Sequence, residues 1–280
     1  MLADAVRRLS DAGVESPRVD AELLLASVLG VSRGRLLTLV EVPDDVAVRF
    51  GTLLDQRADR VPLQHLTGRA PFRFLELAVG PGVFVPRPET EQLTGWALER
   101  LAGTDGPIVV DLGSGSGAIA LSIAHEHPGA RVTAVERDPG AIEWTRHNAL
   151  ARASAGDTPV GVVRGDMTDP ALLSELDGRV TVVVSNPPYV PDGAVVPREV
   201  ADHDPPLALW GGPDGLDVVR GLLVTAARFL HPGGWLGIEH ADQQGTALPA
   251  LVRAHGGFTD VEDHPDLAGR PRFTTARRAT

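Results

Sequence analysis

Short apolar runs alternate with longer amphipathic segments from about residue 88 to the end of the chain. The runs with the composition of strands are residues 108–112, 131–136, 160–163, 180–185, 235–239, 259–263 and 273–277. Helical segments lie between most of them. Strands that alternate with helices are joined by right-handed crossovers and form a mostly parallel, doubly wound sheet. The sequence therefore predicts an α/β fold with a seven-stranded sheet, whose ligands bind beyond the carboxyl ends of the strands.

The first part of the chain has a different pattern, that of short amphipathic helices separated by glycine and proline. Leu2, Val6 and Leu9 share one helix face, and Gly13 ends that segment. Further helical segments begin near Pro17, Ser32 and Pro43. We therefore expect a small helical domain over residues 1–71.

Two apolar segments, 72–79 and 83–85, flank the sequence Gly80-Pro81-Gly82. Strands on either side of a glycine turn are typical of a β-hairpin. We expect this hairpin to form a connector over residues 72–87, between the helical domain and an α/β domain over residues 88–280.

The amino-acid composition excludes several kinds of chemistry. The chain of 280 residues contains no cysteine and no lysine, so disulfides, thiolate nucleophiles, Schiff bases and the lysine of a P-loop are excluded. Its formal net charge of −11 does not favour binding to nucleic acid. It has neither the start of a signal peptide nor eighteen consecutive apolar residues, and we expect no membrane contact and a cytoplasmic location.

A glycine-rich loop follows the first strand of the α/β part. It reads Gly113-Ser114-Gly115-Ser116-Gly117, and Ala118 begins the next helix. Glycines permit a tight turn there and let the backbone approach a ligand closely. The spacing also satisfies the loose fingerprint of a dinucleotide site, so the loop alone does not identify the ligand.

Two acids help to separate the possible ligands. Asp111 stands directly before the glycines, where a pyrophosphate would not need a carboxylate but the ammonium group of S-adenosylmethionine would be attracted to one. Glu136 ends the next strand, where an acid can bind ribose hydroxyls of either cofactor. After the third strand, Asp166 is placed to accept from an adenine amino group, and Met167 could lie against its ring. These residues favour S-adenosylmethionine over a nicotinamide cofactor.

The sequence Asn186-Pro187-Pro188-Tyr189 follows directly after the apolar strand 180–185. A nitrogen conjugated to a π-system is a poor nucleophile, because its lone pair is delocalised. The Asn186 side-chain oxygen and the Pro187 carbonyl can accept its N–H groups and free that lone pair. Neither proline has an N–H, and each fixes its own φ, so the loop is stiff. Tyr189 can cover the flat face of the target group.

The chain resembles the HemK/PrmC family, the peptide chain release factor N(5)-glutamine methyltransferases, over essentially its whole length. The segments that carry this resemblance are residues 84–91 (Phe-Val-Pro-Arg-Pro-Glu-Thr-Glu), 111–117, 186–189, 204–209 and 211–217. The Asn-Pro-Pro-Tyr motif is shared with DNA adenine methyltransferases. Its combination with the segment 84–91, the segment 211–217 and a helical N-terminal domain is more specific.

The resemblance implies a Rossmann-like class I methyltransferase that uses S-adenosylmethionine to methylate the glutamine amide in the Gly-Gly-Gln motif of class I release factors. Residues 113–117, Glu136, Met167 and Asn186 would contact the cofactor, residues 186–189 would hold the glutamine, and the N-terminal helices would hold the release factor. Met167 departs from the family, in which an aromatic residue is frequent at this position.

Several other functions use some of the same sequence features. A nucleic-acid adenine N6-methyltransferase would use the same chemistry, but the acidic C-terminal part and the lack of a DNA-reading domain count against it. A nicotinamide oxidoreductase would leave Asp111 and residues 186–189 without a role, and a binding module without catalysis would not need the intact motif. None of the nine histidines has the spacing of metal ligands, and we expect no metal site.

Overall fold

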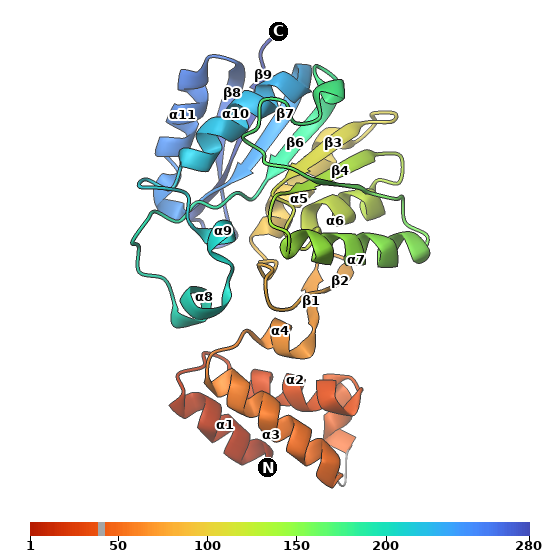
Figure 1. The fold of residues 1–280 in the computed structure, drawn as a ribbon, viewed down its shortest axis with the longest axis vertical. Coiled ribbons are helices and arrows are strands. Elements are labelled where there is room, and N and C mark those ends of the chain that lie inside the picture. Colours follow the sequence, from red (N-terminus) through yellow and green to blue (C-terminus); the bar gives the residue numbers. More distant parts are fainter. Residues whose placement is uncertain (39–42) are drawn as a thin grey trace. The chain divides into compact units, whose positions relative to one another are not determined.

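The computed structural model describes residues 1–38 and 43–280 (Figure 1). Its internal contacts divide the chain into two compact units. We call them the helical unit, which comprises Met1–Arg69, Val79–Pro81 and Val195–Asp204, and the α/β unit, which comprises Ala70–Ala78, Gly82–Ala194 and Pro205–Thr280. The helical unit thus includes a short segment that follows the Asn-Pro-Pro-Tyr motif in the sequence.

The helical unit has its own hydrophobic core, to which Leu9, Leu24 and Phe50 contribute fully buried side chains. Its elements are α1 (Leu2–Asp11), α2 (Pro17–Leu29), η1 (Arg33–Thr38), α3 (Asp44–Ala58), α4 (Leu63–Thr67) and α8 (Arg198–His203). The segment expected to be helical from near Ser32 is a 3-10 helix as far as Thr38, and its continuation, residues 39–42, lies outside the described residues.

The α/β unit is built around a seven-stranded sheet with the strand order β5-β4-β3-β6-β7-β9-β8. The strands are β3 (Ile108–Leu112), β4 (Arg131–Glu136), β5 (Gly161–Arg164), β6 (Val180–Ser185), β7 (Leu230–Glu239), β8 (Phe258–Pro265) and β9 (Pro271–Arg278). The first five pair in parallel, whereas β9 is antiparallel to both β7 and β8. The expected mostly parallel, seven-stranded sheet is confirmed.

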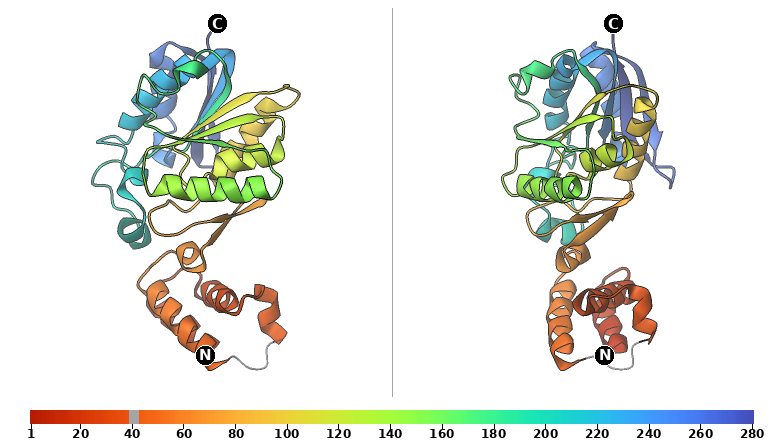
Figure 2. Two further views of the ribbon diagram at one scale, coloured as in Figure 1. Left: turned by 45° about the vertical axis from the view of Figure 1, so that its right-hand side comes forward. Right: turned by 90° about the vertical axis from the view of Figure 1, so that its right-hand side faces the viewer.

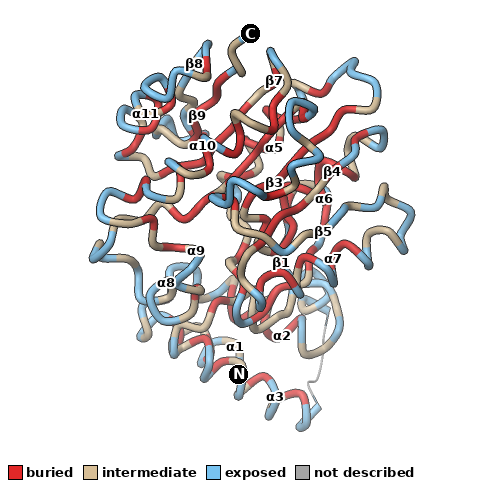
Figure 3. Tube along the Cα trace, turned by 45° about the horizontal axis from the view of Figure 1, so that its top comes forward, coloured by how far each residue is buried: buried red, intermediate tan, exposed pale blue. Residues whose placement is uncertain are grey.

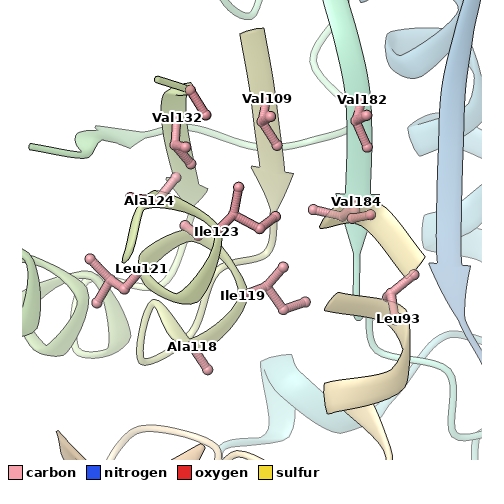
Figure 4. Packing of buried hydrophobic residues seen from close by; sticks show 14 of the residues in the cluster. Leu93, Val109, Ala118, Ile119, Leu121, Ile123, Ala124, Val132, Val182 and Val184 are labelled. Atoms are coloured by element: carbon pink, nitrogen blue, oxygen red, sulfur yellow. The ribbon is translucent and has the colours of Figure 1, made fainter. Parts of the chain in front are cut away.

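Helices cover both faces of this sheet (Figures 1 and 2). The helices of this unit are α5 (Thr90–Leu101), α6 (Ala118–Glu126), α7 (Ala141–Ser154), α9 (Pro206–Leu209), α10 (Asp217–Phe229) and α11 (Ala247–His255), with the 3-10 helices η2 (Ser174–Leu176) and η3 (Asp242–Gln244). Val109 packs with residues of α5 and α6, and Figure 4 shows this cluster. Val110 packs with residues of α10 and α11. Consecutive residues of a strand point to opposite faces, and so β3 is buried along its whole length (Figure 3).

The expected hairpin around Gly80-Pro81-Gly82 is wrong in its position. The paired strands are β1 (Arg69–Phe72) and β2 (Leu75–Ala78), and residues 83–85 form no strand. Arg73 makes the turn with a left-handed φ of 51°, and its guanidinium pairs with Glu126 at 2.5 Å. Side-chain contacts therefore hold a turn that contains no glycine.

The long strand β7 also begins earlier than expected, at Leu230 and not at Trp235. The register of its pairing with β6 shifts, because Val180 pairs with Leu230 but Val182 pairs with Trp235. Gly233, in the extra stretch of β7 between these partners, has a φ of 81°. Among the described residues, no helix is long and apolar enough to cross a membrane.

Candidate active site

The carboxyl ends of the parallel strands β3, β4, β5 and β6 lie at one edge of the sheet, and the predicted site residues follow them. Asp111 is paired in register with Ala134 of β4 and with Val184 of β6. Ser185, the last residue of β6, donates its hydroxyl to the carbonyl oxygen of Leu112 at 2.5 Å. The glycine loop and the Asn-Pro-Pro-Tyr loop therefore begin from adjacent, hydrogen-bonded strands.

The three glycines of the loop share a backbone conformation but differ in their surroundings. All have positive φ, at 81° for Gly113, 56° for Gly115 and 86° for Gly117. A Cβ at Gly113 would lie 2.8 Å from the Met167 side chain, and one at Gly117 would lie 2.9 Å from Leu121. Around Gly115, by contrast, a Cβ would meet no atom within 4 Å. The positive φ therefore favours glycine at all three positions, and they differ only in that the outer two adjoin the ends of flexible side chains, whereas the central one faces open space.

Glu136 holds this loop in place from the end of β4. Its Oε2 accepts from the Gly115 N–H at 2.9 Å, and its Oε1 accepts from the N–H groups of Arg137 and Asp138, each at 2.8 Å. A carboxylate offers about four acceptor positions, so roughly one remains after these three bonds. Glu136 can therefore order the loop and still accept from a ligand hydroxyl.

Two residues of α7, neither of them predicted from the sequence, also support the glycine loop. Thr145 donates to the Gly115 carbonyl at 2.6 Å and lies 3.3 Å from the Ser114 hydroxyl. Asn148 donates to the Ser116 carbonyl at 2.9 Å and also bonds the backbone of Ala78. No local sequence pattern connects α7 with a loop about thirty residues earlier, so only the fold reveals this support.

Asp111 is completely buried within β3. Its Oδ2 accepts from the Ala120 N–H in the first turn of α6 at 3.1 Å, and its Oδ1 has no hydrogen-bond partner among the described residues. Burial, and to a lesser extent the nearby charge of Glu136, raise the pKa of this carboxyl to about 7, against the opposing effect of the Ala120 bond. A buried carboxylate with a free oxygen is suited to a cationic group.

Asp166 and Met167 follow β5 but differ in their surroundings. Asp166 is partly exposed, and its oxygens accept from the N–H and the hydroxyl of Thr168 and from Arg137 at 3.1 Å. Met167 is buried in the core with Leu112 and packs under Gly113. Asp166 lies at the same edge as Glu136, whereas Met167 supports the glycine loop from below.

The Asn-Pro-Pro-Tyr loop is held by hydrogen bonds from three directions. Asn186 Nδ2 donates to Thr90 Oγ1 at 3.2 Å, and the Tyr189 carbonyl accepts from Gln244 Nε2 at 3.1 Å. Val190, directly after the motif, pairs with Trp210 as an isolated bridge. Pro187 and Pro188 are both buried. The loop is therefore preformed.

The segment 211–217, singled out by the resemblance, packs against the back of this loop. A Cβ at Gly211 would lie 2.6 Å from the Pro188 carbonyl oxygen, and one at Gly215 would overlap the Tyr189 carbonyl. The Gly211 N–H donates to Val190 at 2.9 Å. Only glycine permits this close approach of two backbone segments, which explains the glycines without a ligand role.

Glu239, at the end of β7, is a further acid at this edge that the sequence analysis missed. It is 1% exposed, and its Oε2 has no hydrogen-bond partner among the described residues. Burial raises its pKa to about 7, although hydrogen bonds from the nearby side chains of Thr90 and Asn186, together with Arg272, act in the opposite direction. Like Asp111 and Glu136, Glu239 is an acid at the end of an apolar strand, and this is its signal in the sequence.

Metal ligands do not gather at this site. Within the ranges 1–38 and 43–280, no three histidine, cysteine or acidic side chains are arranged to hold a metal ion.

Comparison with known proteins places the chain among methyltransferases. A family model for the PrmC N-terminal domain matches residues 1–68, and one for the methyltransferase small domain matches residues 75–202. A solved 16S rRNA N2 G1207 methyltransferase of T. thermophilus, in complex with AdoMet and guanosine, is 24% identical with a TM-score of 0.53, over 75% of this chain and 49% of that one. A Pyrococcus furiosus methyltransferase is 18% identical with a TM-score of 0.52, over 74% and 90% of the two chains. These two structures show the fold.

Curated relatives are much more similar and are matched over nearly their whole length. The release factor glutamine methyltransferase of Streptomyces coelicolor is 51% identical over 99% of this chain and 97% of its own. That of Mycolicibacterium smegmatis is 50% identical over 98% and 95%, and that of Mycobacterium tuberculosis is 46% identical over 98% and 89%. Identity at this level and coverage shows that the chain belongs to the release factor glutamine methyltransferase family.

Proposed function

We propose that this protein transfers a methyl group from S-adenosylmethionine to the side-chain amide nitrogen of the glutamine in the Gly-Gly-Gln motif of class I peptide chain release factors. The observation that carries the proposal is the preformed Asn186–Tyr189 loop, which begins from the strand next to the glycine loop and Asp111. Its relatives' names support a release factor as the substrate. Because those relatives match almost the whole chain, the adenine methyltransferase alternative is not favoured.

The residues at the sheet edge fit S-adenosylmethionine. Asp111 has a buried oxygen without a partner, suited to the ammonium group, and Gly115 leaves open space beside the backbone. Glu136 keeps roughly one acceptor position for a ribose hydroxyl, and Asp166 lies at the end of the next strand. When bound here, S-adenosylmethionine would supply an electrophilic methyl group, with its sulfonium sulfur leaving as a neutral thioether.

Asn186 and Pro187 act on the nitrogen that receives the methyl group. The lone pair of a glutamine amide is delocalised into its carbonyl, so the nitrogen is planar and weakly nucleophilic. Asn186 Oδ1 and the Pro187 carbonyl accept its two N–H groups and favour the pyramidal geometry that the nitrogen adopts as its new bond to carbon forms. These acceptors are fixed before substrate binds and therefore lose little free energy in reorganisation.

The proton of the methylated nitrogen needs no strong base. The nitrogen becomes much more acidic as its bond to carbon forms, and water can take the proton. Tyr189 is mostly buried, and burial raises the pKa of its phenol, so the ring stays neutral. Tyr189 therefore covers the flat face of the amide group and does not act as the base.

The helical unit would hold the release factor, because the cofactor residues all lie in the α/β unit. Hydrogen exchange tests this role. A release factor should slow exchange in α1 to α3, whereas the cofactor alone should leave these helices unchanged. Protection confined to the α/β unit would assign substrate binding to that unit.

Incubation of the purified protein with a class I release factor and labelled S-adenosylmethionine tests the proposed reaction directly. Mass spectrometry should find one added methyl group on the glutamine of the Gly-Gly-Gln motif. A release factor with alanine in place of that glutamine is the matched control and should remain unlabelled. Label on adenine in added nucleic acid, or on neither substrate, would refute the proposal.

A further inference from the structure

The orientation of the Asn186 amide decides whether the proposed reaction can occur. Its oxygen has to face the target nitrogen, and its NH₂ group has to face away. The two ends of an amide have nearly the same size, so only hydrogen-bond partners fix which way it points. The structure has Asn186 Nδ2 donating to Thr90 Oγ1 at 3.2 Å. A hydroxyl both donates and accepts, so Thr90 alone cannot enforce this orientation.

Glu239 can fix the direction of these hydrogen bonds, which Thr90 alone cannot do. Ser185 pairs in register with Ile238, so Asn186 and Glu239 are the next residues on two adjacent strands. Burial raises the pKa of the Glu239 carboxyl, whereas hydrogen bonding from the side chains of Thr90 and Asn186 lowers it, and this places both groups beside the carboxyl. An ionised carboxylate only accepts. The Thr90 hydroxyl must then donate to Glu239 and accept from Asn186, and Asn186 must present its NH₂ group to both.

We propose that Glu239 and Thr90 are positioning residues that fix the Asn186 amide with its oxygen toward the target nitrogen. The inference rests on the proposed function. A buried carboxylate costs free energy unless its bonds compensate for the loss of water, and one Glu239 oxygen has no partner among the described residues. A neutral side chain would pack more favourably at this position, but it would not fix the direction of the hydrogen bonds.

Glu239 also makes the orientation depend on pH. Its pKa is about 7, and the charged or titratable groups around it are Arg272 on β9, Glu89 before α5 and Tyr189 after β6. Below this pKa the carboxyl becomes a donor and can bond the Asn186 oxygen in the reversed orientation. Methyl transfer should therefore increase with pH through about 7.

Two threonine variants test the network through kinetics. Thr90→Val removes the hydroxyl at nearly constant volume and should lower kcat by about tenfold, the equivalent of one hydrogen bond, with little change in KM or in cofactor Kd. Thr90→Ser keeps the hydroxyl and should restore most of kcat. Thr94→Val, one turn further along α5, is the matched control, since the Thr94 side chain is buried and, in the part of the chain that the structure describes, bonds only the Thr90 carbonyl. If Thr90→Val kept the wild-type kcat, or if it only raised KM, the proposal would be overturned.

NMR of the cofactor-free protein gives a readout that does not depend on methylation. The side-chain NH₂ protons of Asn186 should exchange slowly and shift with an apparent pKa near 7, and Glu239→Gln should abolish both this titration and the pH dependence of kcat. Thr90→Val should accelerate their exchange. Should wild-type protein fail to methylate any release factor while these NMR results hold, the proposed function would be wrong but the network would stand. Fast exchange and no titration in wild type would overturn the network itself.

Discussion

Buried acids in the two units of this protein include pairs that are compensated and single groups that are not. In the helical unit, Asp20 and Arg57 are both almost inaccessible and are paired at 2.7 Å. Arg57 also bonds Glu199 at 2.9 Å and the Val61 carbonyl at 3.0 Å. In the α/β unit, Asp111 and Glu239 are equally buried but have no ion-pair partner among the described residues, and each has one oxygen without any hydrogen bond.

Compensated and uncompensated buried charges have different roles in a protein. A paired and fully bonded buried charge is compatible with a stable fold, whereas an uncompensated one lowers stability. The uncompensated acids both lie at the carboxyl ends of strands, where a doubly wound sheet binds its ligands. We therefore interpret the Asp20–Arg57–Glu199 cluster as structural and the two acids of the sheet edge as functional.

The largest expected effect is on the stability of the helical unit. Arg57→Ala leaves Asp20 buried without a partner and should lower the free energy of unfolding by about 3–5 kcal/mol. Urea denaturation measures the loss. Arg18→Ala is the matched control, because Arg18 pairs with Glu22 on the surface, and such pairs contribute about 0–1 kcal/mol. Equal midpoints for the two variants would show that burial of the cluster has no structural consequence.

Next in size is the loss of Asn186. Asn186→Ala removes an acceptor that acts as the nitrogen leaves planarity and should lower kcat by roughly 10²–10³-fold, by analogy with the loss of one oxyanion-hole donor. Cofactor affinity should change much less, since the other cofactor contacts lie on residues 111–117 and Glu136. Single-turnover kinetics separates the two effects. Transfer at the wild-type rate would make the loop a scaffold and end the proposed mechanism.

The sheet was predictable from the sequence because local patterns determine it. Strands β3, β4 and β6 have the bounds that their apolar runs predicted, and the resemblance led to the segments that surround the site. The turn of the β1–β2 hairpin was not predictable, because Arg73 makes it through a partner 53 residues away.

The supports of the site were also hidden in the sequence. Thr90 and Asn186 are 96 residues apart, and Arg57 and Glu199 are 142 apart. Tertiary structure alone creates such pairs, and no local periodicity reports them. Glu239 is a different case, since it ends an apolar strand as Asp111 nearly does. The sequence therefore does carry a signal for Glu239.

A smaller effect is expected at Asp111. Asp111→Asn keeps the acceptor for the Ala120 N–H but loses the charge, so affinity for S-adenosylmethionine should fall by about 10–100-fold, the equivalent of one bond to a charged group. The raised pKa of Asp111 means that its contribution to stability is lost as pH rises from its ordinary 3.8 through about 7. The variant should therefore unfold at a higher temperature than wild type at pH 8 without cofactor. Calorimetry measures the affinity, and thermal unfolding measures the stability. An unchanged affinity would contradict the functional interpretation.

The smallest expected effect is the pH dependence of cofactor binding in the wild-type protein. An ammonium group prefers the ionised form of Asp111, whose pKa without ligand is about 7. Binding below pH 7 must therefore release a proton, and affinity should fall by about tenfold from pH 7.5 to pH 6. Titration calorimetry in two buffers with different ionisation enthalpies counts the released proton. Asp111→Asn should abolish the dependence, whereas Glu239→Gln, which changes the other acid with a pKa near 7, should leave it intact. If Glu239→Gln abolished it instead, the ammonium group would be bound near β7, and Asp111 would have to be grouped with the structural acids of the helical unit.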